Sequence, residues 1–189
     1  MNGVKSAELF AKRKHSHITR KDGKTPYFNH LQDVVNRLKK LGIENQNIIC
    51  AGWLHDTIED TDTDFDDIEE RFGLKVANIV SDVTKDKRLP KQERERKFVK
   101  QLQSASIEAK IIKLCDITSN LTDLTNMPGS KKKKIEQISN KMEYFAAIQY
   151  DLIKNRKTMI LPVIDEINSI LQKYGISSAH YYEPKSQKL

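Results

Sequence analysis

The chain of 189 residues has the length of one domain and is long enough to bury a substantial core. No apolar run reaches the roughly 18 residues that a membrane span needs, and residues 1–15 lack the apolar stretch of a signal peptide, so we expect a cytoplasmic protein without a membrane partner. The formal net charge of +7 permits a nucleic acid or a small phosphorylated substrate, but residues 56–70 contain nine acidic and no basic side chains, so we expect no stable nucleic-acid partner.

Helical patterns dominate the chain, and no convincing strand pattern of period two is present. We therefore predict an all-α fold, a single helical bundle over residues 1–189 with a flexible tail at 178–189. In chain order, the expected helices cover about residues 6–14, 25–41, 45–56, 63–72, 74–83, 91–103, 106–124, 131–153 and a last segment that ends at Tyr174.

Local signals predict where several helices begin and end. Thr25 is expected to cap a helix with Pro26 at its first position, and Gly42 is expected to end that helix. Thr63 is expected to cap a later helix. Pro162 is expected to kink the last one, because a proline inside a helix removes a backbone hydrogen bond.

Two carboxylates are predicted to lie in apolar surroundings. Asp56 ends the most apolar helix of the chain, and Asp116 interrupts the apolar segment KIIKLCDI. A buried carboxylate costs several kcal/mol unless it is paired or bound to a cation. Lys113 or a basic residue from a distant segment is one possible partner, but a single metal ion would neutralise both carboxylates.

Two histidines accompany these carboxylates. His55 is adjacent to Asp56, and His30 lies on the edge of an apolar helix face. Two imidazoles and two carboxylates suit Mn²⁺, Fe²⁺, Zn²⁺, Co²⁺ or Mg²⁺, and four protein ligands leave room for water and a substrate oxygen. Taken singly, each histidine could be an ordinary core residue. The combination with Asp116 favours a metal site, because each residue removes the desolvation problem of the others.

Glu59 and Asp60 follow the His-Asp pair at helical spacing. If the helix continues, both project from the face of the ligands and could orient or deprotonate a metal-bound water and then protonate the leaving oxygen. The alternative is that they begin a solvated acidic face. A calcium loop that starts at Asp60 is excluded, because Phe65 and Arg71 occupy positions that require Gly and Glu.

Three polar residues could contact a substrate. Asn120 lies four residues after Asp116 and could bond a ribose or a phosphate, while Arg20 and Lys21 precede the His30 helix and could hold phosphates. Ordinary surface polarity is the alternative for all three.

Four segments resemble a known family. RKDGKTPYFNH, WLHDTIEDTDTDFDDIEERFG, VTKDKRLPKQERERK and AKIIKLCDITSNLTDL are similar to the hydrolase domain of the RelA/SpoT group, and most similar to its stand-alone members, the small alarmone hydrolases of the Mesh1 type. The resemblance covers roughly residues 7–150. It implies an all-α HD-domain fold and an Mn²⁺-dependent 3′-pyrophosphohydrolase of ppGpp-type nucleotides. The synthetase of the longer relatives has no room here, so we expect hydrolysis without synthesis.

The resemblance also implies individual roles. It matches the metal ligands His30, His55, Asp56 and Asp116, the acidic reaction-centre pair Glu59 and Asp60, and the nucleotide contacts Arg20, Lys21 and Asn120.

The chain departs from the family pattern around the pocket. Ile117 and Thr122 stand where basic residues are usual, and Leu31 replaces a common Pro. Ile138 and Met142 align with an Arg and a Tyr that lie near the pocket in Mesh1-type proteins. These changes leave several substrates open: a guanine alarmone, an adenine alarmone such as ppApp, or another nucleotide such as a monophosphate or NADPH, cleaved by a phosphatase. A non-catalytic nucleotide-binding module is a further alternative.

Overall fold

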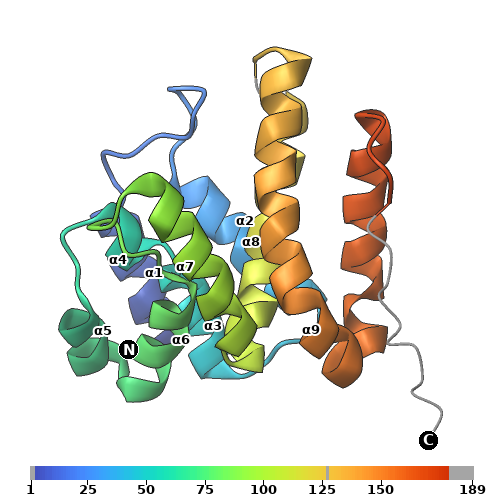
Figure 1. Ribbon diagram of the computed structural model, residues 1–189. Helices are drawn as coiled ribbons and strands as arrows, with labels where there is room; N and C mark the ends of the chain where they lie inside the picture. Colours follow the sequence, from blue (N-terminus) through green and yellow to red (C-terminus); the bar gives the residue numbers. More distant parts are fainter. Residues whose placement is uncertain (1–2, 127, 179–189) are drawn as a thin grey trace, which may run out of the picture.

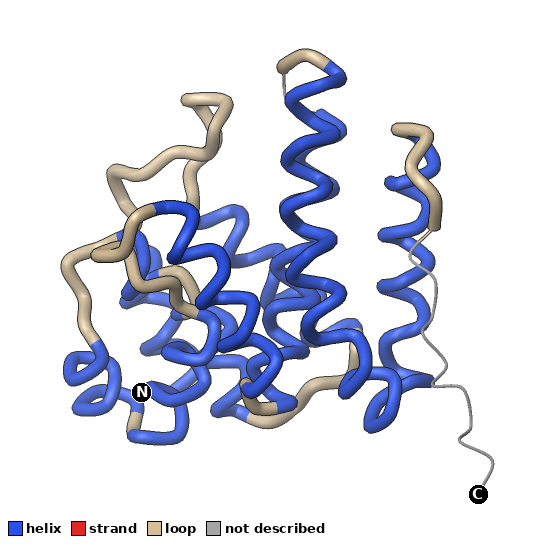
Figure 2. Tube along the Cα trace, viewed as in Figure 1, coloured by secondary structure: helices blue, strands red, loops and turns tan. Residues whose placement is uncertain are grey.

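The computed structural model describes residues 3–126 and 128–178, in which the regular structure is helical apart from one isolated bridge between Thr19 and Pro26 (Figures 1 and 2). The predicted all-α fold is confirmed. The expected flexible tail lies, from residue 179 on, outside the described residues. The helices are α1 (Gly3–Lys14), α2 (Phe28–Lys40), α3 (Gln46–Leu54), α4 (Thr57–Asp60), α5 (Phe65–Phe72), α6 (Leu74–Val83), α7 (Lys91–Ser104), α8 (Ile107–Asn126) and α9 (Lys131–Lys173).

The apolar helix α3 lies at the centre of the fold. Every residue from Ile48 to Leu54 is buried, and the helix packs against α1, α2, α6 and α8. A helix that is apolar on all sides needs such neighbours, because it has no face to offer to water. Within the described part of the chain, no helix is both long and apolar enough to cross a bilayer.

Helices α2 and α3 approach each other closely at Gly52. A Cβ atom on Gly52 would lie 2.6 Å from Leu38 Cδ1 and 3.4 Å from Val35 Cγ2, so only glycine fits without a shift of the neighbours. Because His30 lies on α2 and His55 directly follows α3, this contact brings the two histidines to the same end of the helix pair.

Several helix ends follow the expected signals and one is displaced. The Asn45 side chain caps α3, and Gly42, with φ of 76°, follows the end of α2. Helix α5, however, is capped by Asp64 and not by Thr63. Asp64 accepts from the backbone N–H of Asp67 and donates its own N–H to the Asp67 carboxylate, which satisfies two backbone groups at once.

The prediction that Thr25 and Pro26 begin a helix is wrong. Helix α2 begins at Phe28, and Thr25 instead donates both its hydroxyl and its backbone N–H to the carboxylate of Asp22. Pro26 is engaged in the bridge with Thr19. These bonds close a compact loop before α2, and Arg20 lies in the first half of this loop.

Helix α9 is interrupted at Arg156, where φ is −144° and ψ is 24°. The predicted kink at Pro162 is therefore wrong in position, since the proline lies inside the segment that follows the break. We call residues 131–155 the first arm and residues 157–173 the second arm. Figure 1 shows that the chain turns back at the break, so the two arms lie side by side in a helical hairpin next to α8.

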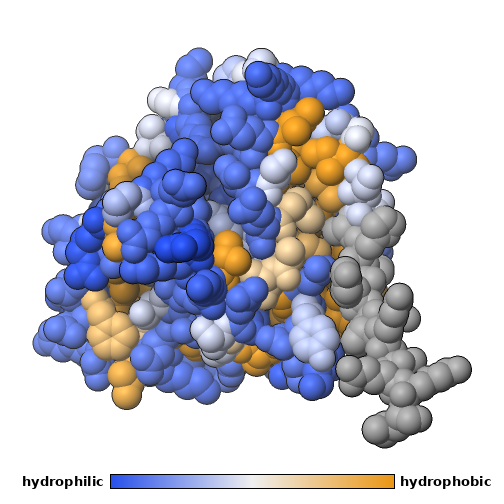
Figure 3. All heavy atoms as spheres, in the orientation of Figure 1, coloured by the Kyte–Doolittle hydropathy of each residue, from blue (hydrophilic) through white to orange (hydrophobic). Residues whose placement is uncertain are grey.

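The second arm is tied to the rest of the fold by polar contacts. Glu166 forms an ion pair with Arg37 of α2 at 2.8 Å and accepts a hydrogen bond from Thr122 of α8. Figure 3 shows a mostly hydrophilic face on which apolar side chains gather along the seam between the arms. The first arm lies beside the loop that contains Arg20 and Lys21, and Lys21 donates a hydrogen bond to Gln137 of this arm.

Candidate metal centre and its pocket

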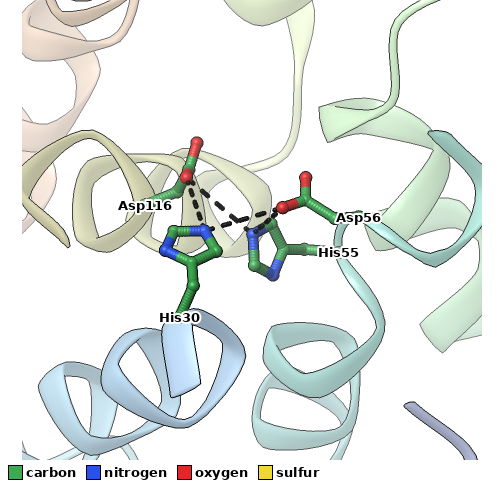
Figure 4. A group of neighbouring side chains, drawn as sticks. All are labelled: His30, His55, Asp56 and Asp116. Carbon is green, nitrogen blue, oxygen red and sulfur yellow. Dashed lines mark ion pairs between the residues drawn. The ribbon is translucent and has the colours of Figure 1, made fainter. Parts of the chain in front are cut away.

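Four side chains from three parts of the fold converge on one point (Figure 4). His30 comes from α2, His55 and Asp56 from the turn between α3 and α4, and Asp116 from α8. One ligand atom of each lies within 4.8 Å of the others. His30 Nε2 is 3.6 Å from Asp56 Oδ2 and 3.2 Å from Asp116 Oδ1, and His55 Nε2 is 3.0 Å from Asp56 Oδ2.

The imidazole of His30 is oriented through its second nitrogen. His30 Nδ1 lies 3.0 Å from Ser119 Oγ. Burial raises the pKa of Asp33, but hydrogen bonds from Arg37 and Ser119 outweigh it and lower the pKa of this carboxyl. The Ser119 oxygen can accept a hydrogen bond from the Nδ1–H of His30. The lone pair of a neutral His30 is then on Nε2, facing the two aspartates.

His55 is oriented in the same way by a backbone group. Its Nδ1 lies 2.9 Å from the Gly52 carbonyl oxygen, which can only accept, so Nδ1 carries the hydrogen and Nε2 the lone pair. The Nε2 atoms of His30 and His55 are both buried, and although they lie 3.2 Å and 3.0 Å from carboxylate oxygens, neither makes a well-formed hydrogen bond with a described residue. Buried polar atoms without a partner are rare. A cation between the imidazoles and the carboxylates would satisfy both, so the residues present fit a divalent metal ion.

The charges of the site are strongly coupled. Burial alone would raise the pKa of both carboxyls, but His55 holds the pKa of Asp56, and Lys113 that of Asp116, well below the usual range. Burial lowers the pKa of His55, yet the charges of Asp56 and Asp116 outweigh it and raise this pKa to about 9. In the metal-free protein a proton on His55 therefore takes part of the role of the cation.

Lys113 is the basic partner that the sequence left open. Its Nζ donates to Asp116 Oδ2 at 2.8 Å, and the side chain is buried. The other oxygen, Asp116 Oδ1, remains turned to His30. Lysine pairing and metal binding are thus compatible at this carboxylate, because each uses a different oxygen.

Tyr27 also belongs to the site, although it is not among the residues predicted from the sequence. Its hydroxyl donates to Asp56 Oδ2 at 2.7 Å, and its ring stacks on His15 with centroids 5.2 Å apart. The hydrogen bond helps to hold the carboxylate of Asp56, whose Oδ2 also faces His30 and His55. A tyrosine three residues before a histidine carries no signal of this role, since the spacing is equally typical of core packing.

Asp56 and Asp116 line a cavity of about 270 Å³ with mixed charge. Its other walls are formed by the loop before α2, by α4, by the segment after α6 and by the first arm of α9. The remaining lining residues are Thr19, Arg20, Lys21, Tyr27, Glu59, Asp60, Lys85, Lys113, Asn120 and Lys141.

Glu59 and Asp60 reach this cavity by a different route from the one expected. The helix does not continue past His55; α3 ends at Leu54, and the two acids lie on the separate short helix α4. Glu59 accepts a hydrogen bond from the backbone N–H of Lys85 at 3.2 Å, and burial together with the charge of Asp56 raises its pKa. Asp60 pairs with Lys87 at 2.8 Å.

Arg20, Lys21 and Asn120 also line the cavity. Hydrogen bonds join Arg20 to α8 and Lys21 to α9. Arg20 Nη2 donates to Asn120 Oδ1 at 3.0 Å, and Asn120 Nδ2 donates to the carboxylate of Asp116. Lys21 Nζ donates to Gln137 at 2.7 Å. The loop is therefore connected, through Asn120, to one of the four converging residues.

The expected pocket positions on α9 are wrong by one residue. Ile138 is fully buried in the core, and Met142 packs against it. From α9, Lys141 lines the cavity instead, and Gln137 and Lys141 line a small separate pocket that Arg20 and Lys21 also line. Of the other departures, Ile117 is also a core residue, so its apolar side chain makes no contact with the cavity.

Comparisons with known proteins agree with this geometry. Residues 7–148 match the HD domain family. The guanosine-3′,5′-bis(diphosphate) 3′-pyrophosphohydrolase MESH1 of Homo sapiens is 47% identical over 129 residues, which cover 65% of this chain and 72% of the human protein. MESH1 of Xenopus tropicalis is 46% identical over 123 residues, which cover 64% of this chain and 69% of that protein.

A solved structure has the same fold. It is described as a metazoan orthologue of SpoT that hydrolyses ppGpp and plays a role in starvation responses, and it superposes with a TM-score of 0.81 at 29% identity, covering 93% of this chain and 97% of its own. The match of residues 7–148, the two MESH1 relatives and this shared fold show that the chain belongs to the HD domain family and, within it, to the MESH1 group.

Proposed function

We propose that the protein is a metal-dependent 3′-pyrophosphohydrolase of (p)ppGpp-type nucleotides. The observation that carries this proposal is the pair of buried, unsatisfied Nε2 atoms of His30 and His55, which face the carboxylates of Asp56 and Asp116 beside a cavity with basic walls. The names of the MESH1 relatives and the described activity of the structural neighbour support the substrate class.

His30, His55, Asp56 and Asp116 would hold the cation, for which we propose Mn²⁺. The mixed nitrogen and oxygen donors suit this ion, and a bound divalent metal supplies Lewis acidity and a more acidic water. Comparing activity after metal removal and reloading with Mn²⁺, Mg²⁺, Zn²⁺, Fe²⁺ or Co²⁺ tests the choice.

Glu59 is the proposed proton carrier at the reacting centre. Its raised pKa and its position on the cavity wall suit a group that accepts a proton from the attacking water and returns it to the leaving ribose oxygen. Asp60 would orient the water beside it. Arg20, Lys21 and Asn120 would hold the nucleotide, since a guanidinium, an ammonium and an amide can all bind phosphate or ribose oxygens.

The test is product identification with purified protein. With Mn²⁺, we expect pyrophosphate and GDP from ppGpp, and a parallel assay with ppApp determines the preferred base. Orthophosphate release from NADPH or a monophosphate, with 3′-diphosphates untouched, would instead identify a phosphatase. With ATP and GDP we expect no synthesis of ppGpp.

A ligand variant links turnover to the metal site. Asp116→Asn keeps the shape but removes the charge, so we expect loss of bound metal by mass spectrometry and a fall in kcat/KM of more than about 100-fold. The control is Asp66→Asn, an exposed acid of α5 that does not line the cavity. Nucleotide binding without turnover in the wild-type protein would identify a binding module and refute the enzymatic proposal.

A further inference from the structure

Three lysines from different segments gather around one aromatic ring on the cavity wall. The Nζ atoms of Lys85, Lys113 and Lys141 lie 4.8 Å, 5.4 Å and 5.6 Å from the centroid of the Tyr144 ring. Lys85 and Lys113 also lie over Phe98, at 5.2 Å and 5.0 Å. All three lysines line the cavity beside the candidate metal centre. We call Lys85, Lys113 and Lys141 the lysine cluster.

The ring at the centre of the lysine cluster is held in place. Tyr144 packs edge-on against Phe98 with centroids 5.2 Å apart, and its hydroxyl donates to the carboxylate of Glu95. Both rings are buried. Cation–π contacts with fixed aromatic faces let ammonium groups gather with less loss of solvation than an apolar wall would impose.

The three lysines of the cluster differ in how they are paired with acidic groups. Lys113 pairs with Asp116 at 2.8 Å, and Lys85 has a longer pair with Glu95 at 3.4 Å. Lys141 forms no ion pair with any residue that the structure describes, and its ammonium group lies over the ring of Tyr144. Burial lowers the pKa of Lys141 to about 8; the negative charge of Asp116 opposes this shift, and repulsion from Lys113 and Lys85 adds to it. An anion in the cavity would relieve this repulsion.

The place of the lysine cluster defines which part of a substrate it can reach. Lys113 is bonded to one oxygen of Asp116, whose other oxygen faces His30, so the cluster borders the metal position directly. Arg20 and Lys21 belong to the separate loop before α2. Besides Arg20 and Lys21, the cavity thus has three further basic side chains, and one of them borders the metal position.

We propose that the lysine cluster binds the terminal phosphate of the diphosphate group that is cleaved, with Lys141 as the contact that distinguishes a diphosphate ester from a monophosphate ester. The inference rests on the proposed function and names its substrate class more narrowly. In the reaction, water adds to the phosphorus attached to the ribose, the bond from that phosphorus to the 3′ oxygen breaks, and this oxygen takes the proton. Pyrophosphate leaves with its P–O–P bond intact, one phosphate against the metal centre and the other on the lysine cluster.

The kinetic test uses two nucleotides that differ by that one phosphate. Lys141→Met removes the charge and keeps the aliphatic stem. We expect it to raise KM about tenfold for guanosine 5′-diphosphate 3′-diphosphate, because a charge-assisted hydrogen bond is lost. For guanosine 5′-diphosphate 3′-monophosphate, measured as a substrate or as a competitive inhibitor, we expect no change beyond about twofold.

Two further variants make the test specific. Lys141→Arg keeps the charge and should restore most of the affinity for the 3′-diphosphate. Lys154→Met, on the exposed side of the same arm and away from the cavity, should behave as wild type. If Lys141→Met weakens both nucleotides equally, or neither, the proposal is overturned.

A second measurement does not depend on the nucleotide. In excess Mn²⁺, inorganic pyrophosphate should raise the thermal midpoint of the wild-type protein more than orthophosphate does, and Lys141→Met should remove this difference. An equal shift by pyrophosphate in both proteins refutes the lysine subsite. Failure of the wild type to hydrolyse any 3′-diphosphate while this pyrophosphate preference persists refutes the proposed function and leaves the subsite standing.

Discussion

At the scale of single residues, Ser119 controls how His30 faces the metal centre. Its oxygen lies 3.0 Å from His30 Nδ1 and can accept the Nδ1–H, which would hold the ring in the tautomer with its lone pair on Nε2. Ser119→Ala removes this acceptor without adding bulk. We expect the Kd for Mn²⁺ to rise by at least about tenfold, as is typical when such a supporting hydrogen bond is lost. Metal titration checks this.

Ser139 provides the control for that change. It is an exposed serine whose hydroxyl donates to the Ile135 carbonyl within α9, so Ser139→Ala removes a hydroxyl far from the metal ligands. Equal metal affinity of the Ser119→Ala and Ser139→Ala proteins would show that Ser119 does not position His30.

The pKa of His55 predicts how metal binding depends on pH. In the metal-free protein the pKa is raised to about 9, and only the neutral imidazole can bind a cation through Nε2. A proton therefore competes with the metal below pH 9. We expect the apparent affinity for Mn²⁺ to increase with pH, by up to about tenfold per unit, and to level off as pH approaches 9. Titrations from about pH 7 to 9 measure this, and a flat profile contradicts it.

Physical chemistry explains which of these residues could be recognised in the sequence. The sequence shows ionisable residues within apolar segments at Asp56, Asp116, His30 and His55. Such positions can be recognised without a structure, because burial of an ionisable group is unfavourable unless it is paired. Their convergence in the structure is confirmed, and their role as ligands stays a prediction. Lys141 gave no such signal. It is one lysine among many on an amphipathic helix, and its place beside Lys85 and Lys113, which are distant in sequence, is seen only in the structure.

At the scale of elements, the contact between α2 and α3 fixes the separation of the two histidines. Gly52→Ala places a methyl group 2.6 Å from Leu38 Cδ1, so one helix must shift. Overpacking of this kind costs about 1–3 kcal/mol, and we expect chemical denaturation to show a loss of that size in the free energy of unfolding.

Gly52→Ala should also weaken metal binding, an effect that strain confined to the contact between α2 and α3 would not produce. Because His55 Nδ1 bonds the carbonyl of Gly52 itself, any shift of α3 moves the imidazole relative to His30. We expect weaker Mn²⁺ binding in Gly52→Ala. Unchanged stability together with unchanged affinity would show that the two helices can separate without consequence.

Element boundaries were predicted well where one dominant signal exists. Asn45 and Gly42 act at the ends where they were expected, because their effect is local. The break in α9 was misplaced, since Pro162 is tolerated within the second arm whereas Arg156 takes a non-helical conformation that its residue type does not announce. The phase of the first arm was wrong by one residue for a similar reason. Both Gln137 and Ile138 fit an amphipathic helix, and only packing against α8 decides between them.

At the scale of the whole molecule, the metal centre joins three parts of the chain that are distant in sequence. His30, Asp56 and Asp116 lie on α2, before α4 and on α8, so a bound ion opposes their separation on unfolding. We expect free Mn²⁺ at about 100 times its Kd to stabilise the fold by about 2.7 kcal/mol. Thermal unfolding with and without a chelator measures this, and the Asp116→Asn protein should show no difference.

Helix α9 contributes no side chain to the four converging residues, yet its first arm supplies Lys141 to the cavity wall and Gln137 to a separate small pocket. The four converging residues and the α9 side of the cavity can therefore be changed independently of each other. Substitutions along this half-buried helical face can change the cavity wall without changing His30, His55, Asp56 or Asp116.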